Sequence, residues 1–101
     1  MNVQIQTVHF DADSKLIEHV NAKIEKLKTF HDKIIGAEVY LKLDNMSQQV
    51  RDKVAEIKIH VPRHSYFVKH QSKTFEESFD VAFNSLVNQV KRQKEKQMAY
   101  S

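Results

Sequence analysis

Basic side chains recur at helical spacing in two segments of this chain. In the first, His19, Lys23, Lys26 and Phe30 follow one another at intervals of four, three and four residues, which places them along one side of a helix. The second is a long amphipathic segment that ends in a basic group, which comprises Lys91, Arg92, Lys94 and Lys96. Lysine and arginine side chains on a rigid surface neutralise phosphate groups. The two groups therefore predict binding of a polyanion, and structured RNA fits them best.

The same charges also have a purely structural explanation. Glu76, Glu77 and Asp80 stand near the start of the second segment and the bases near its end, an order that complements the dipole of a helix. Lysines in the first segment are also typical of a solvated helix face. The binding hypothesis is favoured because both helices are expected on one face of the same sheet, where the two basic strips would line a common groove.

Other chemistries have weaker support. His60 and His64 are four residues apart, but they lie on either side of a proline turn, and no histidine or carboxylate cluster completes a metal site, so we expect no metal. Gly36 is the only glycine, which excludes a glycine-rich phosphate loop. No pattern marks a nucleophile. We therefore predict a binding protein, not an enzyme, with no catalytic residues and no cofactor.

Three residues of the expected strands leave alternatives open. Tyr40 and Phe67 share the outward phase, where aromatic rings can stack on bases, although ordinary cross-strand contacts are favoured. His70 falls on the inward phase, where a hydrogen-bonded core histidine is favoured over a ligand.

Length and composition indicate one small globular domain. The chain has 101 residues, with 16 Lys and Arg against 13 Asp and Glu and a formal net charge of +3. This excess is mild, so a polyanion site must come from local clustering. The absence of cysteine excludes disulfides and thiolate metal sites. No secretory signal and no apolar run of about 20 residues is visible, so we expect a soluble, cytoplasmic protein with no membrane partner.

Hydrophobic periodicity predicts four strands and two helices. Alternating residues indicate strands at 2–8, 37–43, 55–61 and 66–71, and a helical period indicates helices at 13–30 and 75–96. Asp13 and Thr74 are the predicted N-caps, and Glu77 would complete a capping box with Thr74. Turns are expected at residues 44–49 and 62–64.

This order, β-α-β-β-β-α, predicts an α+β fold. The last three strands should form an antiparallel meander, and both helices should cover one face of a four-stranded sheet, as in double-stranded-RNA-binding domains. The predicted helical core stripes are Leu16, Val20, Ile24 and Leu27, and then Phe75, Phe79, Phe83, Leu86 and Val90. The predicted outer sheet face carries Gln4, Gln6, Tyr40, Lys42, Lys58, Phe67 and Lys69. Residues 1–96 form the single predicted domain, and residues 97–101 a short flexible tail.

Two stretches of the chain resemble a known family. They are LIEHVNAKIEKL at residues 16–27 and FDVAFNSLVNQVKRQK at residues 79–94. Their patterns are similar to L-x-x-x-V-x-x-K-x-x-K-L and I-D-x-A-x-x-x-L-x-x-Q-L-x-K-x-K of the bacterial ribosome hibernation-promoting factors, with Phe79 and Val90 as apolar replacements. His9 and Phe10 match the family's loop after the first strand. The family includes the ribosome-associated inhibitor protein Y and was formerly called the sigma-54 modulation proteins. The resemblance extends over nearly the whole chain.

The resemblance implies a ribosome hibernation factor. Family members lie in the cleft between head and body of the small ribosomal subunit, contact its rRNA and proteins, and cover the messenger and transfer RNA sites. Translation stops, and idle ribosomes are stored under stress or in stationary phase, often as dimers. Residues 1–96 would be the ribosome-binding domain of a cytoplasmic protein that is monomeric when free and has no small-molecule substrate. The length and the short, non-acidic tail fit the short hibernation-promoting type.

The resemblance also assigns residues. Lys23 and Lys26 carry over as rRNA contacts. The other expected contacts on the last helix are Gln89, Lys91, Arg92, Lys94 and Lys96. Apart from the resemblance, additional candidate RNA contacts are His19, Lys28 and Arg63.

The chain departs from the family pattern in two places. Ser85 and Asn88 stand where the family usually has basic residues, on the expected groove side of the last helix. On that helix we expect Arg92 and Lys96 to face the groove, and Lys91 and Lys94 to turn away. Residues 62–65 replace a typically glycine-rich hairpin turn and add Arg63 and His64.

Two alternatives to the hibernation hypothesis remain. The β-β-β-α part suits a generic double-stranded-RNA-binding module, which would recognise duplex shape through lysines. A protein-interaction module would instead use the outer sheet face or an exposed strand edge.

Overall fold

The predicted order of elements is confirmed. The structure is a computed structural model that describes residues 2–44 and 52–99, without the side chains of residues 44, 52 and 94–99. Its elements are β1 (Asn2–Val8), α1 (Ser14–Lys26), the 3-10 helix η1 (Leu27–Thr29), β2 (Gly36–Asp44), β3 (Asp52–Val61), β4 (His64–Ser72) and α2 (Phe75–Ala99).

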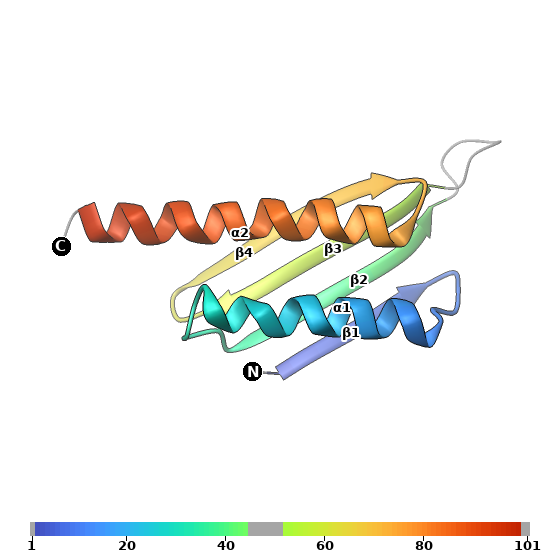
Figure 1. Cartoon of the computed structure of the whole chain (residues 1–101), viewed down its shortest axis with the longest axis horizontal. Helices are drawn as coiled ribbons and strands as arrows, with labels where there is room; N and C mark the ends of the chain where they lie inside the picture. Colours follow the sequence, from blue (N-terminus) through green and yellow to red (C-terminus); the bar gives the residue numbers. More distant parts are fainter. Residues whose placement is uncertain (1, 45–51, 100–101) are drawn as a thin grey trace.

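One sheet organises the molecule. Its strand order is β1-β2-β3-β4, with β1 parallel to β2 and the later strands antiparallel. Because β1 and β2 are parallel, α1 is the crossover between them, while short connections suffice for the meander. Both helices cover the same face of the sheet and run in the same direction along it (Figure 1). The two helix starts therefore lie toward one end of the molecule and the two helix ends toward the other.

The helix starts are fixed by their predicted caps. The Asp13 carboxylate accepts a hydrogen bond from the Leu16 backbone N–H at 2.8 Å. Thr74 Oγ1 accepts one from the Glu77 N–H at 3.1 Å, but the Thr74 N–H donates to Ser72 Oγ at 3.3 Å. Ser72 thus takes the place expected of the Glu77 carboxylate, because the strand that precedes the helix already presents a hydroxyl there.

The helix ends differ from expectation. The first helix was expected to reach Phe30, but α1 ends at Lys26 and the chain tightens into η1. Thr29 Oγ1 donates to the Lys26 carbonyl at 2.7 Å, which satisfies one of the acceptors that a helix end leaves open. In contrast, α2 continues past the expected end at Lys96 to Ala99. Gln, Met and Ala are good helix formers, so nothing at residues 97–99 stops the helix. The rest of the expected tail, residues 100–101, lies outside the described residues.

The predicted core stripes are buried. All nine stripe residues of the two helices join one cluster with Val39, Leu41, Ile57, Ile59 and Val68 from the sheet. His70 is only half-buried, so it is not the core histidine that was favoured. The sequence did not indicate Ser78, which is fully buried and whose hydroxyl donates to the Lys53 carbonyl. Its oxygen also lies 2.9 Å from Ser72 Oγ, so Ser78 joins the first turn of α2 to β3 and β4.

In the parts of the chain that the structure describes, no helix is both long and apolar enough to cross a membrane.

Candidate nucleic-acid interface

A polar layer joins α1 to α2 above the core. His19 Nε2 lies 2.7 Å from Asp80 Oδ1, and Lys23 Nζ lies 3.6 Å from the same oxygen. The Lys23 ammonium also stands 5.6 Å from the centroid of the Phe83 ring. These side chains remain 30 to 37% exposed, so they form a solvent-accessible polar seam between α1 and α2, which we call the groove. Two predicted RNA contacts, His19 and Lys23, thus meet in the groove but share one carboxylate.

Lys91 also belongs to this groove, contrary to expectation. Its ammonium lies 5.1 Å from the centroid of the Phe30 ring, which follows η1. Since each residue advances a helix by about 100°, Gln89 and Ser85 point away from the Asp80 and Lys91 side, and Arg92 is rotated outward. The prediction had therefore chosen the wrong flank of α2. A helical wheel tells which residues share a side, but the flank that meets α1 is set by the path of the chain.

The remaining predicted contacts differ in their surroundings. Lys26 is exposed and makes no ion pair within the part of the chain that the structure describes. Lys28 Nζ lies 3.3 Å from Glu25 Oε2, a pairing along one turn between two exposed side chains. Arg92 and Gln89 are exposed, so both are open to a ligand outside the groove. The side chains of Lys94 and Lys96 lie outside the described residues.

A pocket that the sequence did not indicate lies beside the end of the groove. It has a volume of about 340 Å³ and joins the loop after η1, the β3–β4 turn and α2. Its lining residues are His31, Lys33, Val61, Pro62, Arg63, His64, Tyr66 and Gln93. Only Arg63 among them was a candidate. Burial raises the pKa of Tyr66, so its phenol stays neutral and adds no negative charge. The one feature of the sequence that could have indicated this pocket is the pair His31 and Lys33, but the pair follows no helical or strand periodicity.

Charge is distributed unequally between the two ends of the helical layer. We call the end where both helices begin the starting end; its described charged and histidine side chains include His9, Asp11, Asp13, Lys15, Glu18, Lys53, Lys73, Glu76, Glu77 and Asp80. We call the opposite end the finishing end; it carries Glu25, Lys26, Lys28, His31, Asp32, Lys33, Arg63, His64, Lys91 and Arg92. Acids predominate at the first and bases at the second, although the net charge is only +3. The finishing end and the adjoining groove therefore form the most favourable surface for phosphates.

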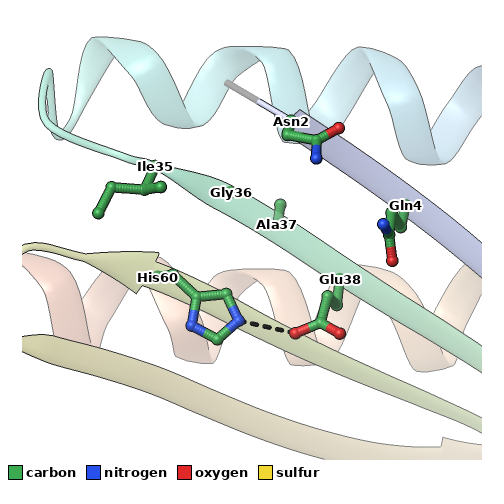
Figure 2. A pocket seen from close by; sticks show the side chains of 7 residues that line it. All are labelled: Asn2, Gln4, Ile35, Gly36, Ala37, Glu38 and His60. Carbon is green, nitrogen blue, oxygen red and sulfur yellow. Dashed lines mark hydrogen bonds and ion pairs between the residues drawn. The ribbon is translucent and has the colours of Figure 1, made fainter.

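The outer sheet face is built differently. Lys42 Nζ lies 2.9 Å from Glu56 Oε2, and His60 Nε2 lies 2.7 Å from Glu38 Oε2 (Figure 2). The Tyr40 hydroxyl donates to the other Glu38 oxygen at 2.9 Å. The hydrogen bond with His60, and to a lesser extent the one from Tyr40, lowers the pKa of the Glu38 carboxyl. The hydrogen bond between Tyr40 and Glu38 raises the pKa of Tyr40. Much of the charge on this face is therefore satisfied within the protein.

The aromatic rings of this face do not contact each other. Tyr40 and Phe67 are separated by β3, where Glu56 and Lys58 stand opposite them in the register. The Lys42 ammonium lies 5.8 Å from the Tyr40 ring centroid, whereas Phe67 is 51% exposed. Of the two rings, Phe67 is thus the more open to a partner.

A second pocket, of about 260 Å³, lies at one end of this face, where β1 begins. Figure 2 shows the Glu38–His60 pair on one side of it and the amides of Asn2 and Gln4 on the other. Ile35 lines it and is 61% exposed. Among the residues that the structure describes, no three histidine or acidic side chains gather closely enough to hold a metal ion, here or elsewhere.

Comparisons with known proteins identify the family. Residues 3–98 match the family of sigma 54 modulation protein / S30EA ribosomal protein. The chain belongs to this family. A search of curated proteins gives no significant match.

Solved structures share the fold. A ribosomal subunit interface protein from Coxiella burnetii superposes with a TM-score of 0.82 at 16% identity, covering 94% of this chain and 99% of that one. The N-terminal domain of Thermus thermophilus Protein Y superposes with a TM-score of 0.77 at 24% identity, covering 91% of this chain and 98% of that one. The predicted α+β fold and the predicted family are both confirmed.

Proposed function

We propose that this protein is a ribosome hibernation factor that binds the small subunit through its rRNA and holds the ribosome inactive. The observation that carries the proposal is the basic groove between two parallel helices, in a chain that belongs to this family. Lys23, Lys26 and Lys91 line or flank the groove, and the finishing end extends the positive surface. Such a surface binds phosphates with an affinity that falls as salt rises.

The proposed mechanism is steric. A domain seated in the decoding cleft would occupy the space of messenger and transfer RNA, so inhibition requires no catalysis. We further propose that the protein acts in the cytoplasm, is monomeric when free, and promotes storage of idle ribosomes, including as dimers.

The groove as built also suggests how binding begins. In the free protein Asp80 holds His19 and Lys23 in place, and an incoming phosphate would compete with that carboxylate. Lys26 and Lys91 have no such competitor among the ion pairs of the described residues, so they would make the first contacts. The contact between the Lys91 ammonium and the Phe30 ring holds that charge beside the end of α1.

The test is sedimentation of the purified protein with vacant ribosomes and isolated small subunits, at low and high monovalent salt. We expect salt-sensitive migration with the small subunit, and a dimer peak if the protein also promotes dimers. The double variant Lys26→Gln, Lys91→Gln should weaken binding and lower the salt slope by about one per residue. Its matched control, Lys58→Gln with Lys69→Gln, removes the same charge from the outer sheet face and should bind normally.

Binding measurements with the same proteins and ribosomes distinguish the two alternative functions. Equal affinity for free RNA duplexes and for ribosomes would favour the generic duplex-binding module. The interaction module has its own support in the exposed Phe67 on the outer face. It would be favoured if Phe67→Ser abolished ribosome binding while the lysine variant did not.

A further inference from the structure

The pocket at the finishing end is assembled from three separate segments of the chain. His31 and Lys33 come from the loop after η1, Arg63 and His64 from the β3–β4 turn, and Gln93 from α2. Val61, Pro62 and Tyr66 supply the apolar part of the wall. At about 340 Å³ the pocket is at the lower end of the range for small-molecule sites, larger than a single inorganic ion needs.

Its polar groups are mainly donors. Lys33 and Arg63 are cationic, and none of the eight lining residues is acidic. The Lys33 backbone N–H donates to His31 Nδ1 at 3.1 Å. With Nδ1 acting as acceptor, the proton of the neutral ring is assigned to Nε2, which leaves His31 able to donate there without taking up a charge. The acid nearest in sequence, Asp32, is exposed and does not line the pocket.

The backbone conformation of Arg63 is a separate observation that bears on a functional role for this arginine. Its φ is +67°, in the left-handed region where a side chain is strained and glycine is not. Pro62 and Arg63 form the connection between Val61 and His64, which pair across the hairpin. A glycine would suit this turn better, yet the chain places there the longest cationic side chain. Strain of this kind, which His9 shares at a φ of +68°, occurs in tight turns and also at functional positions, so it supports the pocket only beside the pocket's own lining.

We propose that this pocket binds the phosphate of a nucleotide unit, with Lys33 and Arg63 holding the phosphate and the histidine rings and Tyr66 wall flanking the rest. The unit is either a free nucleotide or one residue of an RNA strand, since both present the same chemistry. The His64 ring stands edge-on to Tyr66, with 4.6 Å between centroids, and so forms a firm side to the pocket. The site does not depend on the proposed function, because it requires no ribosome.

The experiment is an NMR titration of the full chain with adenosine monophosphate, and separately with a single-stranded RNA of about ten nucleotides. We expect chemical-shift changes at the Lys33 amide and the His31 ring, because both residues line the pocket and a ligand there would disturb the hydrogen bond that joins them. Lys33→Gln and Arg63→Gln should each weaken binding about tenfold, as expected for loss of a charge-assisted hydrogen bond. The control Lys15→Gln removes an exposed lysine at the starting end and should change nothing.

A second variant separates binding from folding. Arg63→Gly relieves the left-handed strain, so it should be at least as heat-stable as the parent protein while losing pocket binding. Shifts with adenosine monophosphate would identify a free nucleotide as ligand, and shifts with RNA alone would identify a strand. The proposal is overturned if neither probe shifts the Lys33 amide and His31 ring, or if Lys15→Gln weakens binding as much as Arg63→Gln. RNA that shifts only groove residues would overturn the pocket and leave the proposed function standing.

Discussion

The two ends of the helical layer use polar residues for opposite purposes. At the starting end, Asp13, Thr74 and Ser78 are each hydrogen-bonded to the backbone, and they hold the first turns of both helices in place. At the finishing end, Lys26, Lys33 and Arg63 make no ion pair within the described residues. The finishing end also has stabilising groups, such as the Thr29 hydroxyl on the Lys26 carbonyl, but it leaves several basic side chains available to a ligand.

Parallel helices underlie this difference between the two ends. Since α1 and α2 run in the same direction, both helix starts lie near the acids of one end, while the end of α1 and the Lys91 turn of α2 lie near the bases of the other (Figure 1). Glu76 and Glu77 lie in the first turn of α2, and Lys23 and Lys26 lie in the last turn of α1. These charges complement the helix dipoles at those two ends and so contribute modestly to stability. The parallel arrangement also concentrates positive charge on one end of a chain with little net charge, which would orient the protein as it approaches an anion.

Charge reversal at the finishing end should have the largest effect. Lys26→Glu with Lys91→Glu changes the groove by four charge units, and we expect ribosome affinity to fall more than about 100-fold because each lost phosphate contact also restores counterions. Thermal stability should fall only slightly: both lysines are exposed, although Lys26 lies in the last turn of α1 and Lys91 contacts the Phe30 ring. Sedimentation and a melting curve measure the two quantities.

The matched control is Lys58→Glu with Lys69→Glu on the outer sheet face. Both lysines are exposed, and the reversal changes the net charge by the same amount. If this control loses ribosome binding to the same extent, binding depends on net charge alone and the distinction between surfaces is wrong.

The starting end should respond in stability instead. Ser78→Ala leaves the Lys53 carbonyl without its donor, so we expect a loss of about 1–3 kcal/mol in the free energy of unfolding. Ribosome affinity should persist at temperatures where the variant is folded. Ser85→Ala, on the exposed surface of the same helix, is the control and should stay within about 0.5 kcal/mol of the parent in urea titrations.

These contrasts also explain what the sequence could predict. The caps, strands and core stripes follow from local spacing: Asp13 precedes an apolar helical period, and Val39 alternates with polar neighbours. The interface depends on distant parts of the chain. His31 and Arg63 line the same pocket only because of the fold, and no periodicity in the sequence indicates this.

The incorrect prediction of which flank of α2 faces α1 has a more specific cause. Spacing correctly separates Lys91 from Gln89, but it does not tell which of them faces α1. That choice follows from the crossover between β1 and β2, which places α1 beside the Asp80 and Lys91 side. Right-handedness of such crossovers is nearly universal, so this part was predictable in principle once β1 and β2 were known to be parallel.

Asp80 is the starting-end acid that pairs with two groove residues, and its removal should favour ligand binding. Asp80→Asn keeps the shape of the side chain but releases Lys23 and His19. We expect RNA or ribosome affinity to rise about fivefold, the effect of one unit charge about 4 Å away in water. Stability should fall by less than about 1 kcal/mol, because the pair is partly exposed. Glu77→Gln removes the same charge outside the groove and should alter affinity less than twofold, as measured by salt titration.

The smallest effect is expected from a substitution on the outer sheet face, which serves as a reference for the helical surface. Hydrogen bonds from His60 and Tyr40 lower the pKa of Glu38 in the folded protein. At a pH between the two pKa values of Glu38, the unfolded chain binds more protons than the folded protein. The ionised Glu38 therefore stabilises the protein fully above the unfolded-state pKa, and this stabilisation is lost as pH falls through the folded-state pKa.

Glu38→Gln should therefore destabilise the protein slightly at neutral pH and by progressively less below the ordinary carboxyl range. Urea titrations of parent and variant between pH 7 and pH 3 measure the convergence. Because Glu38 lies on the face opposite the helices, ribosome affinity at neutral pH should be unaffected. A variant that instead lost ribosome binding at full stability would move the binding surface to the sheet, and the helical groove would then be a structural joint between α1 and α2.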